Sequence, residues 1–185
     1  VTHVVISLDL PPKRLLVWGR SYGLKCPGST MQHPPRVRND MIDPLSTVDV
    51  VEIEQLMARI AATADLAIEL QDYLDNLTED VVFEFAAVPA VGLDAHSYAG
   101  HAAVLAGVEE RRASGVQGPG SRTIHVVADV VVTAEGTESA RVHAAWQYYG
   151  FVDERPAILA MGFYDNAVRK VDGRWLLSRR RVTVL

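Results

Sequence analysis

The chain has 185 residues, a formal net charge of −5 and a hydrophobic fraction of 49%, which fits one globular domain with a core of ordinary size. The acidic balance argues against the basic surface that attracts nucleic acids and anionic membranes, so neither is an expected partner. No apolar run approaches the roughly 20 residues of a membrane-spanning helix, and the single cysteine cannot form an internal disulfide, so we expect a cytoplasmic protein.

Residues 1–44 differ in composition from the rest of the chain. Six of the nine prolines lie there, and residues 1–40 carry a net charge of +4, whereas residues 41–185 carry −9. Dense proline prevents a long helix, so we expect a poorly ordered extension over residues 1–44 and one domain over residues 45–185. The apolar run at residues 4–8 has no basic residue before it, which makes it a poor signal peptide.

The first predicted element is a helix that begins at Ser46. Ser46-Thr47-Val48-Asp49 has the layout of a capping box. Apolar residues then recur in steps of three and four, as on one face of a helix: Ile53, Leu56, Met57, Ile60, Ala61, Ala64, Ala67 and Ile68. The period continues to Leu77 as a short second helix, and residues 81–85 alternate as a strand.

Residues 86–99 are predicted to be a loop, and residues 100–113 have a helical pattern. Four further strands are predicted at residues 122–133, 139–149, 158–169 and 174–184. The short turns between them imply antiparallel neighbours, so the predicted fold class is α+β. We expect a cone-shaped roll in which N-terminal helices pack in a curved antiparallel sheet, with a ligand pocket at its open end.

Asp65 and His125 are the two candidate catalytic residues. Asp65 falls at the border of the apolar helical stripe, where a carboxylate faces at least half inward and needs a partner. His125 alternates with Thr123 and Val127, and on the concave face it would meet the helix that carries Asp65. A carboxylate on one imidazole nitrogen makes the other a suitable general base. Separately, each residue also has an ordinary structural explanation.

Two loop motifs give weaker indications. Gly118-Pro119-Gly120 runs from a helix into a strand, the reverse of a nucleotide-binding loop, and is predicted to be a stiff turn or a rim loop. His96 and His101 match no spacing typical of metal ligands, so no metal is expected.

The strands carry further polar and aromatic candidates. Residues 179–181 are three consecutive arginines that alternate across a strand, which predicts solvated or ion-paired side chains. Aromatic residues on the strands line either a pocket or the core: Trp146, Tyr148 and Tyr164.

Several motifs in a fixed order carry a family resemblance: Ala64-Asp65, Asp72-Tyr73-Leu74, residues 77–83, residues 118–125, Gly162-Phe163-Tyr164-Asp165, Asp172-Gly173-Arg174-Trp175 and residues 179–182. With this order and spacing, residues 46–184 resemble the SnoaL-like branch of the nuclear transport factor 2 superfamily, which includes scytalone dehydratase and hexachlorocyclohexane dehydrochlorinase. The resemblance covers about three quarters of the chain.

The resemblance implies a dyad in which His125 takes a proton from carbon and Asp65 orients the imidazole, without metal or organic cofactor. It implies a lyase or isomerase of the dehydratase, dehydrohalogenase or ketosteroid-isomerase type, acting on a hydrophobic cyclic small molecule. Pocket-lining or carbonyl-polarising roles are expected for four residues: Tyr73, Trp146, Tyr148 and Tyr164. The alternatives are a non-catalytic ligand-binding or dimerisation module and the small subunit of a ring-hydroxylating dioxygenase, because a fold alone does not define chemistry.

The sheet face opposite the pocket is predicted to hold Ile124, Val126 and Val130. Such an apolar face is stabilised by being covered. Members of the resembled family are often dimers or trimers, so we expect a homodimer, with a trimer as the second possibility.

Overall fold

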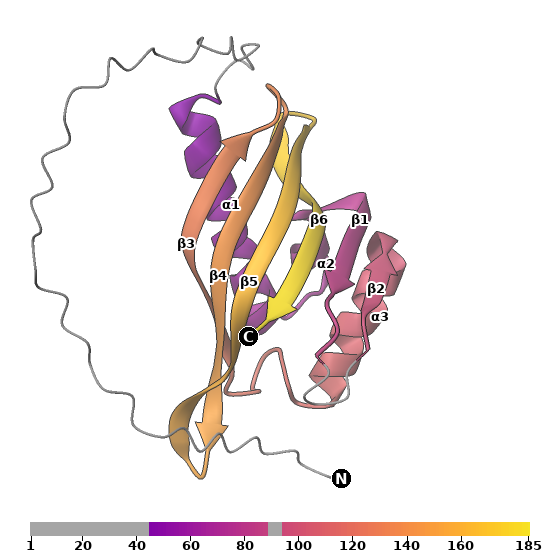
Figure 1. Ribbon diagram of the computed structural model, residues 1–185. Coiled ribbons are helices and arrows are strands. Elements are labelled where there is room, and N and C mark those ends of the chain that lie inside the picture. The colour runs from indigo at the N-terminus through magenta and orange to yellow at the C-terminus, as the bar shows by residue number, and fades with distance from the viewer. Residues whose placement is uncertain (1–44, 89–93) are drawn as a thin grey trace, which may run out of the picture. The chain divides into compact units, whose positions relative to one another are not determined.

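The computed structural model describes residues 45–88 and 94–185, so the expected extension over residues 1–44 lies outside the described residues. The helices and strands follow one another as α1 (Thr47–Leu66), α2 (Gln71–Leu74), β1 (Leu77–Phe85), β2 (His96–Ala99), α3 (Gly100–Ala113), β3 (Ile124–Ala134), β4 (Ser139–Val152), β5 (Arg155–Val171) and β6 (Arg174–Val184) (Figure 1). None of the helices in the two described ranges has the length and apolar character needed to cross a membrane.

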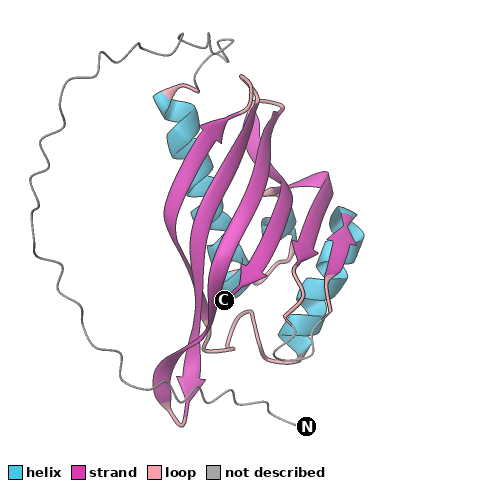
Figure 2. Ribbon diagram, viewed as in Figure 1, coloured by secondary structure: helices cyan, strands magenta, loops and turns pink. Residues whose placement is uncertain are grey.

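The six strands form one curved sheet in the order β2-β1-β6-β5-β4-β3 (Figure 2). Helix α1 packs against β3 and β6, and α3 packs against β1 and β2. The predicted α+β fold is confirmed. The sheet is mixed, because β1 pairs in parallel with β6 while the other neighbours are antiparallel. No short turn joins β1 to β6, so the sequence contained no hairpin signal for this pair.

Two predicted loops are partly strand. Residues 96–99 form β2, which pairs with β1 and stacks the His96 ring on Phe85 with 4.7 Å between ring centroids. The predicted gap between the strands at residues 139–149 and 158–169 lies within the β4–β5 hairpin, whose turn is only Asp153 and Glu154. Both turn residues have positive φ, 48° and 60°, as in the tight two-residue turns that match strand twist.

The apolar stripe of α1 forms the centre of the core. Ile53, Leu56, Met57 and Ile60 are almost fully buried against strand residues of the sheet. The predicted stripe is confirmed as far as Ala64. It is wrong at Ile68, which is exposed because the helix ends at Leu66.

Asp49 ties the start of α1 to two strands. The predicted capping box is present, since the Asp49 backbone N–H donates to the Ser46 hydroxyl at 3.1 Å. Asp49 Oδ1 also accepts from Lys170 Nζ at 2.7 Å and from Trp175 Nε1 at 2.8 Å. The hydrogen bonds from Lys170, Ser46 and Trp175 hold the pKa of the Asp49 carboxyl well below its usual value.

Replacing Asp49 by asparagine is expected to make the free energy of unfolding fall less steeply as the pH is lowered. A carboxyl whose pKa is lower in the folded than in the unfolded protein stabilises the fold above its ordinary pKa, and this contribution is lost as the pH falls. The unaltered protein should therefore lose stability more steeply than Asp49→Asn between about pH 5 and about pH 2. Denaturant unfolding at several pH values measures this, and parallel profiles for the two proteins would contradict it.

Strand β3 contains a bulge at Asp129. Asp129 has a φ of 51° and is the extra residue between two regularly paired stretches of β3 and β4. Before it, His125 and Val127 face the inner side of the sheet; after it, Val130 and Val132 pack on the core. The prediction that Val130 lies on the outer face is therefore wrong, because the bulge reverses the alternation.

The outer face of the sheet is apolar over its β3 side. Large exposed side chains there are Ile124, Val126, Val131, Met161 and Phe163. The predicted exposure of Ile124 and Val126 is thus confirmed. The homodimer expected from this face stays a prediction, which light scattering of the purified protein would check.

Gly162 lies where β5 and β6 approach closely. A Cβ there would lie 1.8 Å from the Thr183 carbonyl oxygen, so one of the strands must shift. We expect Gly162→Ala to lower the free energy of unfolding by about 1 to 3 kcal/mol. Gly136→Ala is the matched control, because its Cβ would meet only the Ser139 hydroxyl. Equal unfolding free energies for the two variants would contradict the expectation.

Candidate active site

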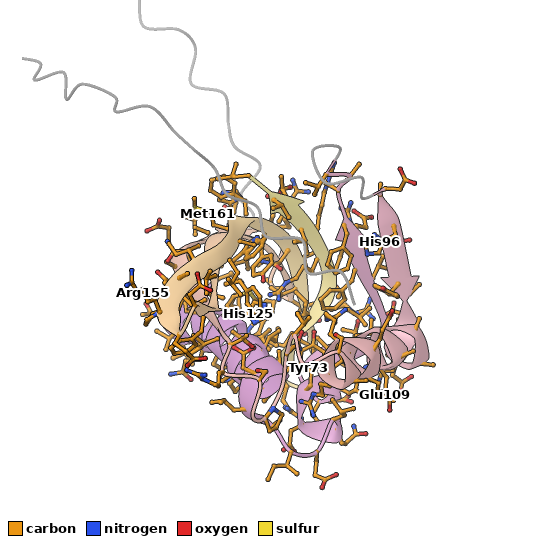
Figure 3. The ribbon with its side chains drawn as sticks, turned by 90° about the horizontal axis from the view of Figure 1, so that it is seen from below. Tyr73, His96, Glu109, His125, Arg155 and Met161 are labelled. Atoms are coloured by element: carbon orange, nitrogen blue, oxygen red, sulfur yellow. The ribbon has the colours of Figure 1, made fainter. Side chains whose placement is uncertain are left out.

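A cavity of about 180 Å³ lies between α1, the loop after α3 and the inner face of the sheet. Six aromatic side chains contribute to its wall: Tyr73, Phe83, Phe85, Trp146, Tyr148 and Tyr164. In the end-on view of Figure 3, His125 and Tyr73 lie inside the curve of the sheet, whereas Met161 lies on its outer side. A dry cavity of about 150 Å³ holds benzene, so this one suits a compound built on about one ring.

Asp65 and His125 are in direct contact at the wall of this cavity. Asp65 lies in the last turn of α1 and is 2% exposed. Its Oδ2 accepts from the His125 backbone N–H at 2.6 Å, and its Oδ1 lies 2.7 Å from His125 Nδ1. Because a carboxylate only accepts hydrogen bonds, we assign the proton to Nδ1 and the lone pair to Nε2. A histidine held in this way is arranged to act as a base.

The four expected aromatic residues all contribute to the cavity wall. Burial raises the pKa of Tyr73 and Tyr148, and raises that of Tyr164 to about 12. All three phenols are therefore neutral donors at neutral pH. The Tyr148 hydroxyl donates to the Val116 carbonyl, and the Tyr148 ring packs on His125 with 4.7 Å between centroids.

Arg180 is a cavity residue that sequence reasoning missed. It is 5% exposed and contributes to the cavity wall, whereas solvated or ion-paired side chains were predicted for residues 179–181. That prediction is confirmed for Arg179, which is paired with Glu84 at 2.7 Å. Arg180 shares the inner face with Val182 and Val184, so its alternation with these apolar residues was the available signal.

Residues 115–120 form the predicted turn after α3 and a part of the cavity wall. Val116 and Gln117 contact the cavity. The Gln117 side chain donates to the Ala64 carbonyl at 3.2 Å and accepts from Arg111 Nε at 3.0 Å. These hydrogen bonds fix the turn to α1 and α3, and they place Arg111 beside the cavity.

The two remaining histidine candidates have local partners. His96 is exposed and its Nδ1 lies 3.2 Å from the Asp94 carbonyl oxygen. His101 Nε2 lies 3.3 Å from the Leu77 carbonyl oxygen. In the part of the chain that the structure describes, His, Cys, Asp and Glu side chains do not gather in groups of three or more that could hold a metal ion.

A helix packed in a curved sheet, with a cavity between them, is the architecture of solved structures described as having a cystatin-like fold, one of them as nuclear transport factor 2-like. The chain belongs to the SnoaL-like domain family, whose model matches residues 46–181.

Several solved structures have the same fold. A putative scytalone dehydratase from Novosphingobium aromaticivorans is 22% identical, with a TM-score of 0.56 over 75% of this chain and 85% of that chain. LinA is 11% identical, with a TM-score of 0.59 over 75% and 86%. The beta subunit of a putative aromatic-ring-hydroxylating dioxygenase from N. aromaticivorans is 16% identical, with a TM-score of 0.60 over 75% and 92%. A search of curated proteins gave no match.

Proposed function

We propose that the protein is a cofactor-independent lyase or isomerase that removes a proton from carbon in a hydrophobic cyclic small molecule. The observation that carries the proposal is the contact between Asp65 and His125 on the wall of an aromatic cavity. A buried carboxylate, an imidazole with a free nitrogen and an apolar binding space are the parts that such a reaction needs.

His125 Nε2 takes the proton, and the electron pair of the broken C–H bond moves toward an electron-withdrawing group of the substrate. In a carbonyl substrate this group becomes an enolate oxygen. Neutral phenols such as Tyr73 and Tyr164 can stabilise it by donating hydrogen bonds. The pair of electrons then either expels a leaving group, which is elimination, or takes a proton at another carbon, which is isomerisation. Asp65 stabilises the imidazolium throughout.

Proton removal from carbon can be observed without knowing the natural substrate. Cyclic β-hydroxyketones and cyclic β,γ-unsaturated ketones would be incubated with the protein in D2O. Proton NMR follows exchange of the C–H group, and ultraviolet absorbance follows the conjugated enone. We expect at least one ring compound to exchange or react. Binding of these compounds with neither exchange nor product would contradict the proposal and favour a non-catalytic binding module.

A second candidate is the small subunit of a ring-hydroxylating dioxygenase. The exposed apolar face around Ile124 and Met161 favours it, because a partner chain could cover that face. Affinity capture from native lysate distinguishes the two. Stable association with a larger iron-containing chain supports the subunit role, whereas a homo-oligomer alone counts against it.

A further inference from the structure

The guanidinium of Arg180 is held in one orientation beside the cavity. Its Nε donates to Asn166 Oδ1 at 2.7 Å, and the Asn166 amide donates in turn to the Val142 carbonyl at 3.1 Å. The Tyr164 ring covers one face of the guanidinium, with Cζ 4.1 Å from the ring centroid. One terminal nitrogen lies 3.7 Å from Met57 Sδ. The group is therefore positioned before any ligand binds.

Among the residues that the structure describes, this buried cation has no carboxylate partner. Within residues 45–88 and 94–185, the ion pairs include neither Arg180 nor Arg111, the second guanidinium on the cavity wall. Both oxygens of the buried Asp65 carboxylate are engaged by His125. Two guanidinium groups and one carboxylate leave an excess of one positive charge around the cavity.

Burying a charge without a counter-charge is strongly unfavourable. A hydrophobic pocket that served only neutral rings would be more stable with an apolar residue in this place. A ligand that brings one negative charge into the cavity would balance it. Among the described residues, the other terminal nitrogen of Arg180 has no hydrogen-bond partner, so it can donate to a carboxylate oxygen.

We propose that the cavity binds a single-ring carboxylate, with its carboxylate group on Arg180 and its ring against the aromatic wall beside His125. The inference names the substrate class of the proposed enzyme. It rests on the proposed function for the chemistry at His125 only, because binding of the anion does not require proton transfer.

Benzoate and benzamide form a matched pair of probes. They have nearly the same shape, but only benzoate is charged, and neither has an aliphatic carbon acid that could react. Isothermal titration calorimetry with the full chain is expected to give benzoate at least tenfold tighter binding than benzamide. Equal affinities, or no binding of benzoate, would overturn the proposal.

Arg180→Met tests the residue itself, and Arg179→Met on the outer face is the matched control. Arg180→Met is expected to weaken benzoate binding at least tenfold and to remove the preference for benzoate over benzamide, while Arg179→Met changes neither affinity. Removal of the guanidinium takes away an unpaired buried charge but leaves Asn166 Oδ1 without its donor, so the melting temperature of ligand-free Arg180→Met is measured before the titrations. If Arg180→Met does not fold, Arg180→Gln is used, whose neutral amide can still donate to Asn166, and benzoate binding at full strength in either folded variant would overturn the proposal.

A His125→Ala variant separates this inference from the proposed function. His125→Ala is expected to keep the selectivity for charge, with benzoate still bound at least tenfold more tightly than benzamide, because that selectivity is attributed to Arg180. Charge-selective binding without any His125-dependent turnover would support the anion site and contradict the proposed enzyme. His125-dependent turnover of neutral rings without selectivity for benzoate would support the proposed enzyme and contradict the anion site.

Discussion

Replacing His125 by alanine is expected to lower turnover of a reactive ring compound by about 10²- to 10⁴-fold, the usual contribution of a general base. The expectation follows from the geometry of the ring. Its Nδ1 is held by Asp65 at 2.7 Å, so Nε2 is the atom that can take a proton. The rate of C–H exchange in D2O is the measurement, because it reports the proton-transfer step without requiring product release.

His143→Ala is the matched control for this prediction. His143 is also paired with an aspartate, Asp165, at 3.0 Å, but it is exposed on the outer face of the sheet. Its removal should leave the exchange rate unchanged. Because alanine at position 125 leaves Asp65 with one hydrogen bond fewer, His125→Gln should also be measured, as its amide can still donate to Asp65. An unchanged rate in both His125 variants, or loss of folding with each, would instead indicate a structural histidine.

Replacing Asp65 by asparagine is expected to reduce turnover by a similar or larger factor while the fold is kept. The asparagine oxygen can still accept from the His125 backbone N–H. Its NH2 group then faces Nδ1, which forces the imidazole proton onto Nε2 and removes the lone pair from the cavity side. The equivalent change in Ser-His-Asp enzymes lowers kcat by about 10⁴-fold.

Asp65→Ala should behave differently from Asp65→Asn, and the difference is diagnostic. Alanine leaves the partly buried His125 N–H without its acceptor, so we expect a loss of about 1 kcal/mol in the free energy of unfolding. Asp165→Asn is the control for both Asp65 variants, because Asp165 is paired with His143 on the outer face of the sheet. Full activity in Asp65→Asn would show that the carboxylate only holds the backbone of β3 in place.

Patterns that depend on near neighbours in the chain predicted most of the fold. The capping box and the spacing of Ile53, Leu56 and Ile60 located α1, since helix periodicity is a local property. The long strands followed from alternation and turn residues. Strand β2 was missed because its four residues, at the edge of the sheet, have only one paired neighbour, so they carry no strong alternation. The parallel pairing of β1 with β6 joins distant segments and leaves no local signal.

The candidate site was predicted in part. The border position of Asp65 and the alternation of His125 placed both on facing elements, and the structure shows them in contact. Arg180 was missed because charged residues are seldom fully buried, and its buried partners come from other elements: Asn166 of β5 and Met57 of α1. These contacts depend on how the curved sheet packs on the helix, which the sequence pattern of β6 alone does not contain.

The bulge at Asp129 lets both halves of β3 face the inner side of the sheet. The strand consists of two half-strands of opposite phase, one that presents His125 to the cavity and one that presents Val130 and Val132 to the core. A substitution at position 129 that tolerates a positive φ, such as asparagine or glycine, leaves both halves in place. A β-branched residue such as valine disfavours the positive φ, and loss of the bulge with the number of residues unchanged would turn either the imidazole or the two valines to the outer surface. The backbone conformation of this one residue therefore decides whether His125 and the two core valines can face inward together.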